Sequence, residues 1–165
     1  MVTRNYQFLS SQDRDKMIGI LKKLLKNNQP TIAVLASCCF IDALSSNYRD
    51  KCGWKRFKKY FQDEMPDVLK QLSENDKNKI NQIKNLDCDI HRGHPKHCKS
   101  SVEIFYRHIR CGLVHDFFNK SEVLVINKPN KKAKGVIVDK SKKNADYALV
   151  INAPVFVKNF YHQLN

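Results

Sequence analysis

The chain has 165 residues, of which 42% are hydrophobic and 10% aromatic, a composition typical of a globular protein and not of a disordered one. This length suffices for one domain with its own core, so we expect a single domain over residues 1–165. The net charge of +14 indicates an anionic partner, most commonly RNA or DNA, although a composition merely rich in lysine and asparagine explains the charge equally well.

Neither a membrane span nor a signal peptide is visible. The longest apolar run, residues 32–44, is interrupted by Ser37 and Asp42 and is too short to cross a bilayer. Residues 1–15 lack the apolar stretch of a signal peptide. The six cysteines show no regular framework, so reduced thiols are expected. We therefore expect a cytoplasmic protein with no membrane partner.

The first half of the chain predicts helices. Ser10 or Ser11 can cap a helix that runs to about Asn27. Its apolar residues recur at helical spacing: Met17, Ile18, Leu21, Leu24 and Leu25. Pro30 then opens a second helix that runs to about Asn47. Because this helix is apolar nearly all round, we expect it to be central and the most buried.

A third helix ends before Pro66 and carries an aromatic stripe, for which packing in the core is favoured over a base-stacking role. The stripe consists of Trp54, Phe57, Tyr60 and Phe61. Asp67 can cap a fourth helix over residues 68–84, and a loop is expected over 85–100. A fifth helix follows from Ser101 to about Asn119.

After Asn119 the apolar period changes to alternation, which predicts strands. Residues 123–125 and 136–138 fit a hairpin over 122–139, and residues 147–151 can add a third strand. Asn152 can cap a last helix that Pro154 starts. The expected fold is mostly α: a helical bundle over 10–119, a small β-hairpin appendage over about 122–151, and a C-terminal helix over 153–164.

Arg110 and His115 lie five positions apart on the predicted helix over residues 101–119. The guanidinium is a planar fork for phosphate oxygens, and an imidazole can transfer a proton near neutral pH. On an ideal α-helix the two side chains diverge by roughly 140°. From these residues alone, either the pair faces a phosphate, or Arg110 pairs with a carboxylate while His115 caps or packs.

The stretch SVEIFYRHIRCGLVHDFFN (101–119) resembles the signature helix of the HEPN superfamily, the higher-eukaryote-and-prokaryote nucleotide-binding domains. Upstream, FIDALSSNYRDKCGWKRFKKYFQDEMP (40–66) is similar to a segment of HEPN-like bacterial proteins. The resemblance implies an all-helical bundle. It also implies a metal-independent ribonuclease of the toxin or defence type, acting as a homodimer in which two signature helices meet at the two-fold axis.

The implied reaction is attack by the RNA 2′-hydroxyl on the adjacent phosphate, with His115 in proton transfer and Arg110 stabilising the developing charge. Arg107 is a candidate second phosphate contact, and Cys111 and Asp116 are candidate supporting residues. Asp42, in the most apolar helix, is a further supporting candidate. If its carboxylate is buried, it needs a cationic partner such as Arg110 or His115; otherwise it lies at the helix edge in water. Three lysines of the 130–134 loop are candidate nucleic-acid contacts: Lys131, Lys132 and Lys134.

CDIHRGHPKHC (88–98) is rich in potential zinc ligands. Cys88, His91, His94 and Cys98 could bind one metal, but their spacing departs from common zinc fingers, and a basic His-rich loop is favoured. No cofactor is therefore expected, with zinc as the weaker alternative.

Three functions stay open. The first is the HEPN-like endoribonuclease, with RNA as its substrate and a homodimer as its active form; an antitoxin is a candidate protein partner. The second is a catalytically inactive HEPN-like module that binds nucleotide, RNA or a protein partner. It is favoured by Cys111, because catalytic members usually carry a polar residue, often Asn, directly after the arginine. The third, a small zinc-binding nucleic-acid protein, depends on residues 88–98 alone.

Overall fold

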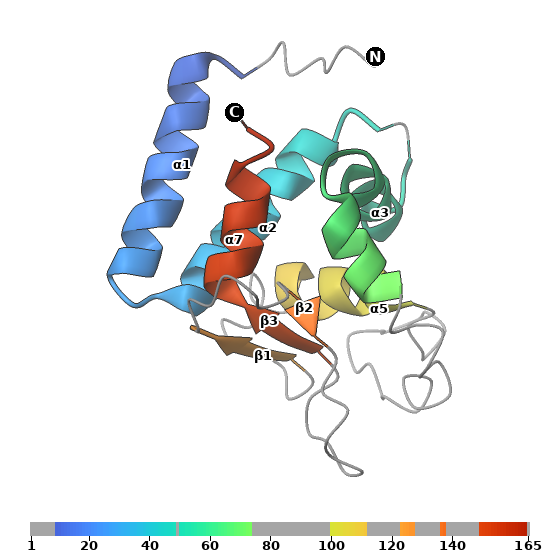
Figure 1. Cartoon of the computed structure of the whole chain (residues 1–165). Coiled ribbons are helices and arrows are strands. Elements are labelled where there is room, and N and C mark those ends of the chain that lie inside the picture. Colours follow the sequence, from blue (N-terminus) through green and yellow to red (C-terminus); the bar gives the residue numbers. More distant parts are fainter. Residues whose placement is uncertain are drawn as a thin grey trace.

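The computed structural model describes residues 9–48, 50–73, 100–111, 123–127, 136–137 and 149–164 (Figure 1). This part of the chain is mostly helical, as expected, and includes a small sheet. Its elements in chain order are α1 (Ser11–Lys26), α2 (Pro30–Ser45), α3 (Gly53–Glu64), a helical stretch over 66–73, α5 (Ser101–Ile104), η1 (Phe105–Cys111), β1 (Val123–Ile126), β2 (Val136–Ile137), β3 (Leu149–Asn152) and α7 (Ala153–Tyr161).

Helix α1 begins and ends as its sequence predicts. The Ser10 hydroxyl accepts a hydrogen bond from the backbone N–H of Asp13 and so caps the helix. At the other end Asn28 takes a φ of 55°, and the N–H groups of Asn28 and Gln29 bond the carbonyls of Leu25 and Leu24. This is the Schellman arrangement, in which a left-handed residue satisfies the last carbonyls of a helix. The chain therefore turns sharply into α2.

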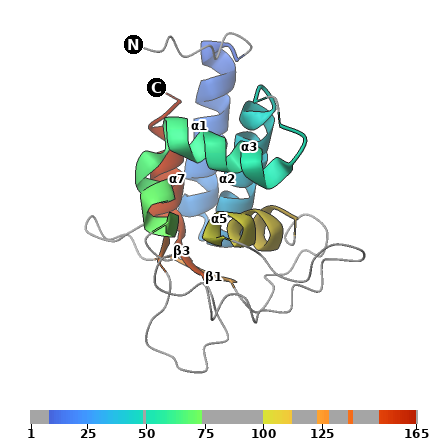
Figure 2. The same ribbon diagram turned by 90° about the vertical axis from the view of Figure 1, so that its right-hand side faces the viewer.

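Helix α2 is the centre of the molecule, as its apolar composition predicts. It contacts α1, α3, α7, η1 and β1 (Figures 1 and 2). Ala33, Val34, Cys38 and Ile41 are completely buried. The two buried hydroxyls of the helix, those of Ser37 and Ser45, donate to the carbonyls of Ala33 and Asp42. Within the described ranges, no helix combines the length and the apolar character needed to span a bilayer.

Helix α3 carries the aromatic stripe, and all of the stripe except the partly exposed Trp54 belongs to the core. Phe57, Tyr60 and Phe61 are essentially buried, which confirms the packing role over base stacking. One expectation is wrong: the next helical stretch begins at Pro66 and not at residue 68, so Asp67 lies inside it and is not its cap. Proline suits the first turn of a helix because its missing N–H would have no partner there.

The predicted fifth helix begins at Ser101, and the Ser100 hydroxyl caps it by accepting from the N–H of Glu103. It is α-helical only as far as Ile104 and becomes a π-helix over Phe105–Cys111. A π-helix has i→i+5 hydrogen bonds and hence a wider turn than an α-helix. Both Phe105 and Ile109 point into the core from it. The remainder of the predicted helix lies outside the described residues.

The strands correct the predicted hairpin. β1 and β2 do not pair with each other, because β3 lies between them, parallel to β1 and antiparallel to β2. The third strand was expected only as an addition, yet it is the central one. Its apolar residues explain this: Val150 and Ile151 are buried, and a buried strand needs hydrogen-bonding neighbours on both edges.

The C-terminal helix packs across α2 and α1. It is shorter than expected, because α7 ends at Tyr161 and residues 162–164 form a turn that still buries Leu164. Asn152 stands at its N-cap position, but its side chain makes no capping hydrogen bond. Phe160 stacks on Phe40 of α2, which fixes α7 against the central helix.

Candidate functional site

Asp42 on α2 holds two arginines from two other helices. Its Oδ2 accepts hydrogen bonds from Nη2 and Nε of Arg110, at 2.6 and 3.0 Å. Its Oδ1 lies 3.6 Å from Nη2 of Arg56 on α3. The three side chains, here called the Asp42 triad, are 17%, 28% and 24% exposed for Asp42, Arg110 and Arg56. The triad therefore sits at the boundary between the core and solvent.

The sequence places each triad residue next to a buried apolar one. Asp42 follows Ile41, Arg56 precedes Phe57, and Arg110 follows Ile109. Each apolar side chain draws its helix face into the core, so the neighbouring charged residue is left at the rim of the same contact.

The expected contact between Asp42 and Arg110 is therefore present, and the alternative of an unpartnered Asp42 in water is wrong. Arg56 was not anticipated. A signal for it exists, because it lies beside the aromatic stripe of a helix that packs on α2.

Within the triad one carboxylate faces two guanidinium groups, so it cannot balance both of their charges. Asp42 therefore orients Arg110 without cancelling the positive charge of the cluster. The Tyr106 ring lies 5.8 Å from Cζ of Arg110, within range of a cation–π interaction. This ring in turn packs edge-on against Phe57, at 4.9 Å between centroids. Arg110 is thus held from two sides.

The thiol of Cys38 lies one helical turn before Asp42 on α2. Burial raises the pKa of the Cys38 thiol well above its ordinary value, and the neighbouring Cys39 raises it further, while Arg110 acts in the opposite direction. Cys38 is therefore a thiol at neutral pH. Because the thiolate is the reactive form, Cys38 is a packing residue and not a nucleophile.

Arg107 is paired within its own helical segment. Its Nη2 and Nε lie 2.8 and 2.9 Å from Oε1 of Glu103, whose side chain is 7% exposed. The arginine and the nearly buried carboxylate compensate each other's charge. The role of Arg107 as a second phosphate contact stays a prediction.

Most of the remaining candidates lie outside the described residues, and for Cys111 only the backbone is described, at the end of η1. Those outside are His115, Asp116, Lys131, Lys132, Lys134 and the possible zinc ligands Cys88, His91, His94 and Cys98. The 140° angle between Arg110 and His115 assumed an ideal α-helix, but Arg110 belongs to a π-helix, to which that geometry does not apply.

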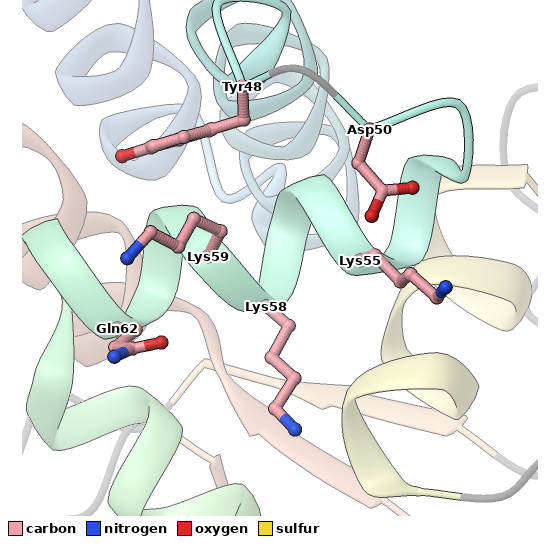
Figure 3. A pocket seen from close by; sticks show the side chains of 6 residues that line it. All are labelled: Tyr48, Asp50, Lys55, Lys58, Lys59 and Gln62. Carbon is pink, nitrogen blue, oxygen red and sulfur yellow. The ribbon is translucent and has the colours of Figure 1, made fainter.

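A second feature was not anticipated from the sequence. A hollow of about 380 Å³ opens on the outer side of α3, lined by Tyr48, Asp50, Lys55, Lys58, Lys59 and Gln62 (Figure 3). Four of these residues come from one helix at positions i, i+3, i+4 and i+7. The spacing is visible in the sequence, on the face opposite the aromatic stripe, and it could have identified this surface.

No protein-family model matches the chain, and neither a curated protein nor a solved structure is significantly similar to it.

Proposed function

We propose that the protein acts on RNA as a HEPN-like, metal-independent endoribonuclease in which Arg110 stabilises the reacting phosphate and His115 transfers protons. The observation that supports this best is the Asp42 triad. A guanidinium fixed by a second helix, in a cluster of two guanidinium groups and one carboxylate, suits the stabilisation of a phosphorane better than a mobile surface arginine does.

In the proposed reaction the RNA supplies its own nucleophile. The 2′-hydroxyl attacks the adjacent phosphorus and loses its proton to a base, and the 5′-oxygen of the next nucleotide leaves with a proton. The products are a 2′,3′-cyclic phosphate and a 5′-hydroxyl. His115 serves the proton transfers, and Arg110 binds the oxygens on which negative charge grows. A homodimer would bring Arg110 of one protomer near His115 of its partner, as the resemblance implies.

Asp42 has a positioning role in this proposal, since it touches Arg110 and not the substrate. Replacing it with asparagine keeps the shape but removes the charge that orients the guanidinium. The expected result is a fall in kcat with little change in KM, because Arg110 would be misplaced for the transition state more than for substrate binding. A matching fall in the Arg110→Lys variant, which keeps the charge but loses the fork, would support the same conclusion.

The second candidate is an RNA-binding module without catalysis. Two observations favour it: Arg110 pairs with a carboxylate, as a structural arginine would, and Cys111 follows it where catalytic HEPN members usually carry a polar residue.

RNA incubated with a chelator separates the two candidates. Wild type is compared with His115→Ala and with His162→Ala, a matched loss of an exposed histidine at the end of α7. The endoribonuclease proposal predicts that wild type and His162→Ala cleave RNA, and that the cleavage rate of His115→Ala is lower by a factor on the order of 100 or more. If wild type and His115→Ala cut RNA equally, the enzyme proposal is wrong. If neither wild type nor His115→Ala cuts RNA but both bind it, the result supports the RNA-binding module.

A further inference from the structure

The outer face of α3 carries a cluster of lysines. At about 100° of rotation per residue, Lys55, Lys58, Lys59 and Gln62 fall within an arc of roughly 100°. Phe57, Tyr60 and Phe61 of the aromatic stripe lie on the opposite side and are buried, so the helix cannot turn its outer face away from solvent. Lysines at i, i+3 and i+4 repel one another and weaken a helix slightly. A fixed helix therefore presents a concentrated positive face.

The charges of this face are only partly compensated. Lys59 pairs with Asp63 at 3.2 Å, in a half-exposed contact worth little in water. Lys55 and Lys58 make no ion pair with any residue that the structure describes. Asp50 lines the same hollow, but its Oδ1 accepts a hydrogen bond from the Cys52 N–H at 2.8 Å and serves the turn before α3. With Asp63 included, the hollow therefore has three ammonium groups against two carboxylates, a net charge of +1.

Tyr48 forms a neutral wall of the hollow. Burial raises the pKa of its phenol, and the carboxylates of Asp63 and Glu64 raise it further, Asp63 also through a hydrogen bond. The phenol is therefore protonated at all physiological pH values and does not repel an anion. Figure 3 shows its ring above Lys59, whereas Lys58 leaves α3 in the direction away from the ring.

The arrangement of the ammonium groups indicates the kind of anion. In Figure 3 the three lysine side chains leave α3 at successive points and spread along the helix without converging on one centre. Lys55 and Lys59 are separated by about 6 Å along the axis, at 1.5 Å per residue. A single small anion would be met by one of these groups at a time, whereas successive phosphates of a chain could meet all three.

We infer that the hollow on α3 binds consecutive backbone phosphates of single-stranded RNA through Lys55, Lys58 and Lys59. This inference rests on the proposed function and adds to it a substrate-holding surface. Arg56, on the adjoining face of α3, reaches Asp42 and through it Arg110, so the same helix joins the phosphate-binding surface to the candidate reaction site. Lysines contact phosphates as point charges, so binding here is independent of base sequence.

The test measures binding of a 2′-O-methyl RNA of roughly 16 nucleotides, which cannot be cleaved because it lacks the nucleophile. Wild type is compared with Lys55→Gln/Lys58→Gln and with Lys23→Gln/Lys26→Gln. The control pair removes two exposed lysines of α1 at the same i, i+3 spacing and the same total charge. All the replaced residues are exposed, so circular dichroism should show unchanged folding.

The α3 variant should bind about 10-fold more weakly at low salt, whereas the control should stay within about twofold of wild type. For a single strand, losing two phosphate contacts lowers the slope of the log binding constant against the log salt concentration by about 1.4 in magnitude. The difference in affinity between the α3 variant and wild type should therefore shrink about sevenfold when the salt concentration rises about fourfold. At the same ionic strength, inorganic phosphate should displace the RNA no better than chloride does.

The other outcomes overturn the inference in distinguishable ways. If both lysine pairs weaken binding equally, the hollow is no different from the rest of the basic surface, and only this inference fails. If wild type binds no RNA but binds anionic lipid vesicles, the proposed function fails with it. If inorganic phosphate competes strongly, the hollow is a small-anion site and not a backbone site.

Discussion

Replacing Asp42 by asparagine tests whether one carboxylate holds three helices together. The substitution keeps the volume but removes the charge that faces Arg110 at 2.6 Å and Arg56 at 3.6 Å. Arg110 and Arg56 would then lose the carboxylate that they share. We expect the free energy of unfolding to fall, and the size of the loss follows from how far the triad is buried.

An exposed ion pair contributes up to about 1 kcal/mol, and breaking a fully buried one costs about 3–5 kcal/mol. The triad side chains are 17–28% exposed, between these limits. We therefore expect a loss of about 2 kcal/mol, which for a chain of this size lowers Tm by about 4–8 °C. Urea unfolding monitored by circular dichroism measures the loss directly.

A comparison with Arg110→Met makes the prediction sharper. Removing Arg110 leaves Asp42 with Arg56, so one pair survives, whereas removing the Asp42 charge leaves both arginines without their carboxylate. Asp42→Asn should therefore destabilise the protein more than Arg110→Met. If Arg110→Met costs as much or more, Asp42 is not the hub of the triad and the account of this site is incorrect.

Three further predictions concern single residues. Gly53→Ala should lower the free energy of unfolding by about 1–3 kcal/mol in urea, because the added Cβ would overlap the Tyr106 hydroxyl; an unchanged midpoint would argue against that packing. The pKa of Tyr48 is raised on folding from its ordinary value of 10.0, so its contribution to stability is complete below that value and is lost as pH rises. Wild type should therefore lose stability more steeply above about pH 10 than Tyr48→Phe, and parallel urea-unfolding profiles against pH would refute this. Cys38, with its buried thiol and raised pKa, should resist iodoacetamide at pH values near 8 until the protein unfolds, as peptide mass mapping can show; rapid labelling of the native protein would contradict its burial.

Local sequence signals predicted the helices of the first half well. The Ser10 cap, the turn after α1 and the Pro30 start of α2 each depend on one or two residues whose backbone preference is strong. The aromatic stripe of α3 likewise has a period that only a half-buried helix explains. These features are local, so the sequence alone identifies them.

The strand order and the contact of Arg56, which the sequence did not predict, depend on long-range interactions. The pairing of β3 between β1 and β2 depends on which edges become buried, and alternation within each strand carries no information about its neighbours. The π-helix over Phe105–Cys111 has the composition of an ordinary α-helix, and we have no physical account of why it forms here. Arg56 was missed for the same reason as the strand order: its contact with Asp42 exists only once α3 packs on α2.

The most direct test of the central proposal is the chemistry of the RNA ends produced in the presence of a chelator. We predict a 2′,3′-cyclic phosphate and a 5′-hydroxyl from wild type, identified by mass spectrometry, and no cleavage at a nucleotide whose 2′-hydroxyl is replaced by hydrogen. Arg110→Lys should slow the same cleavage by about 100-fold, because it loses the fork that Asp42 orients. Cleavage that requires a divalent metal, leaves a 3′-hydroxyl, or proceeds equally fast in Arg110→Lys would contradict the proposed site.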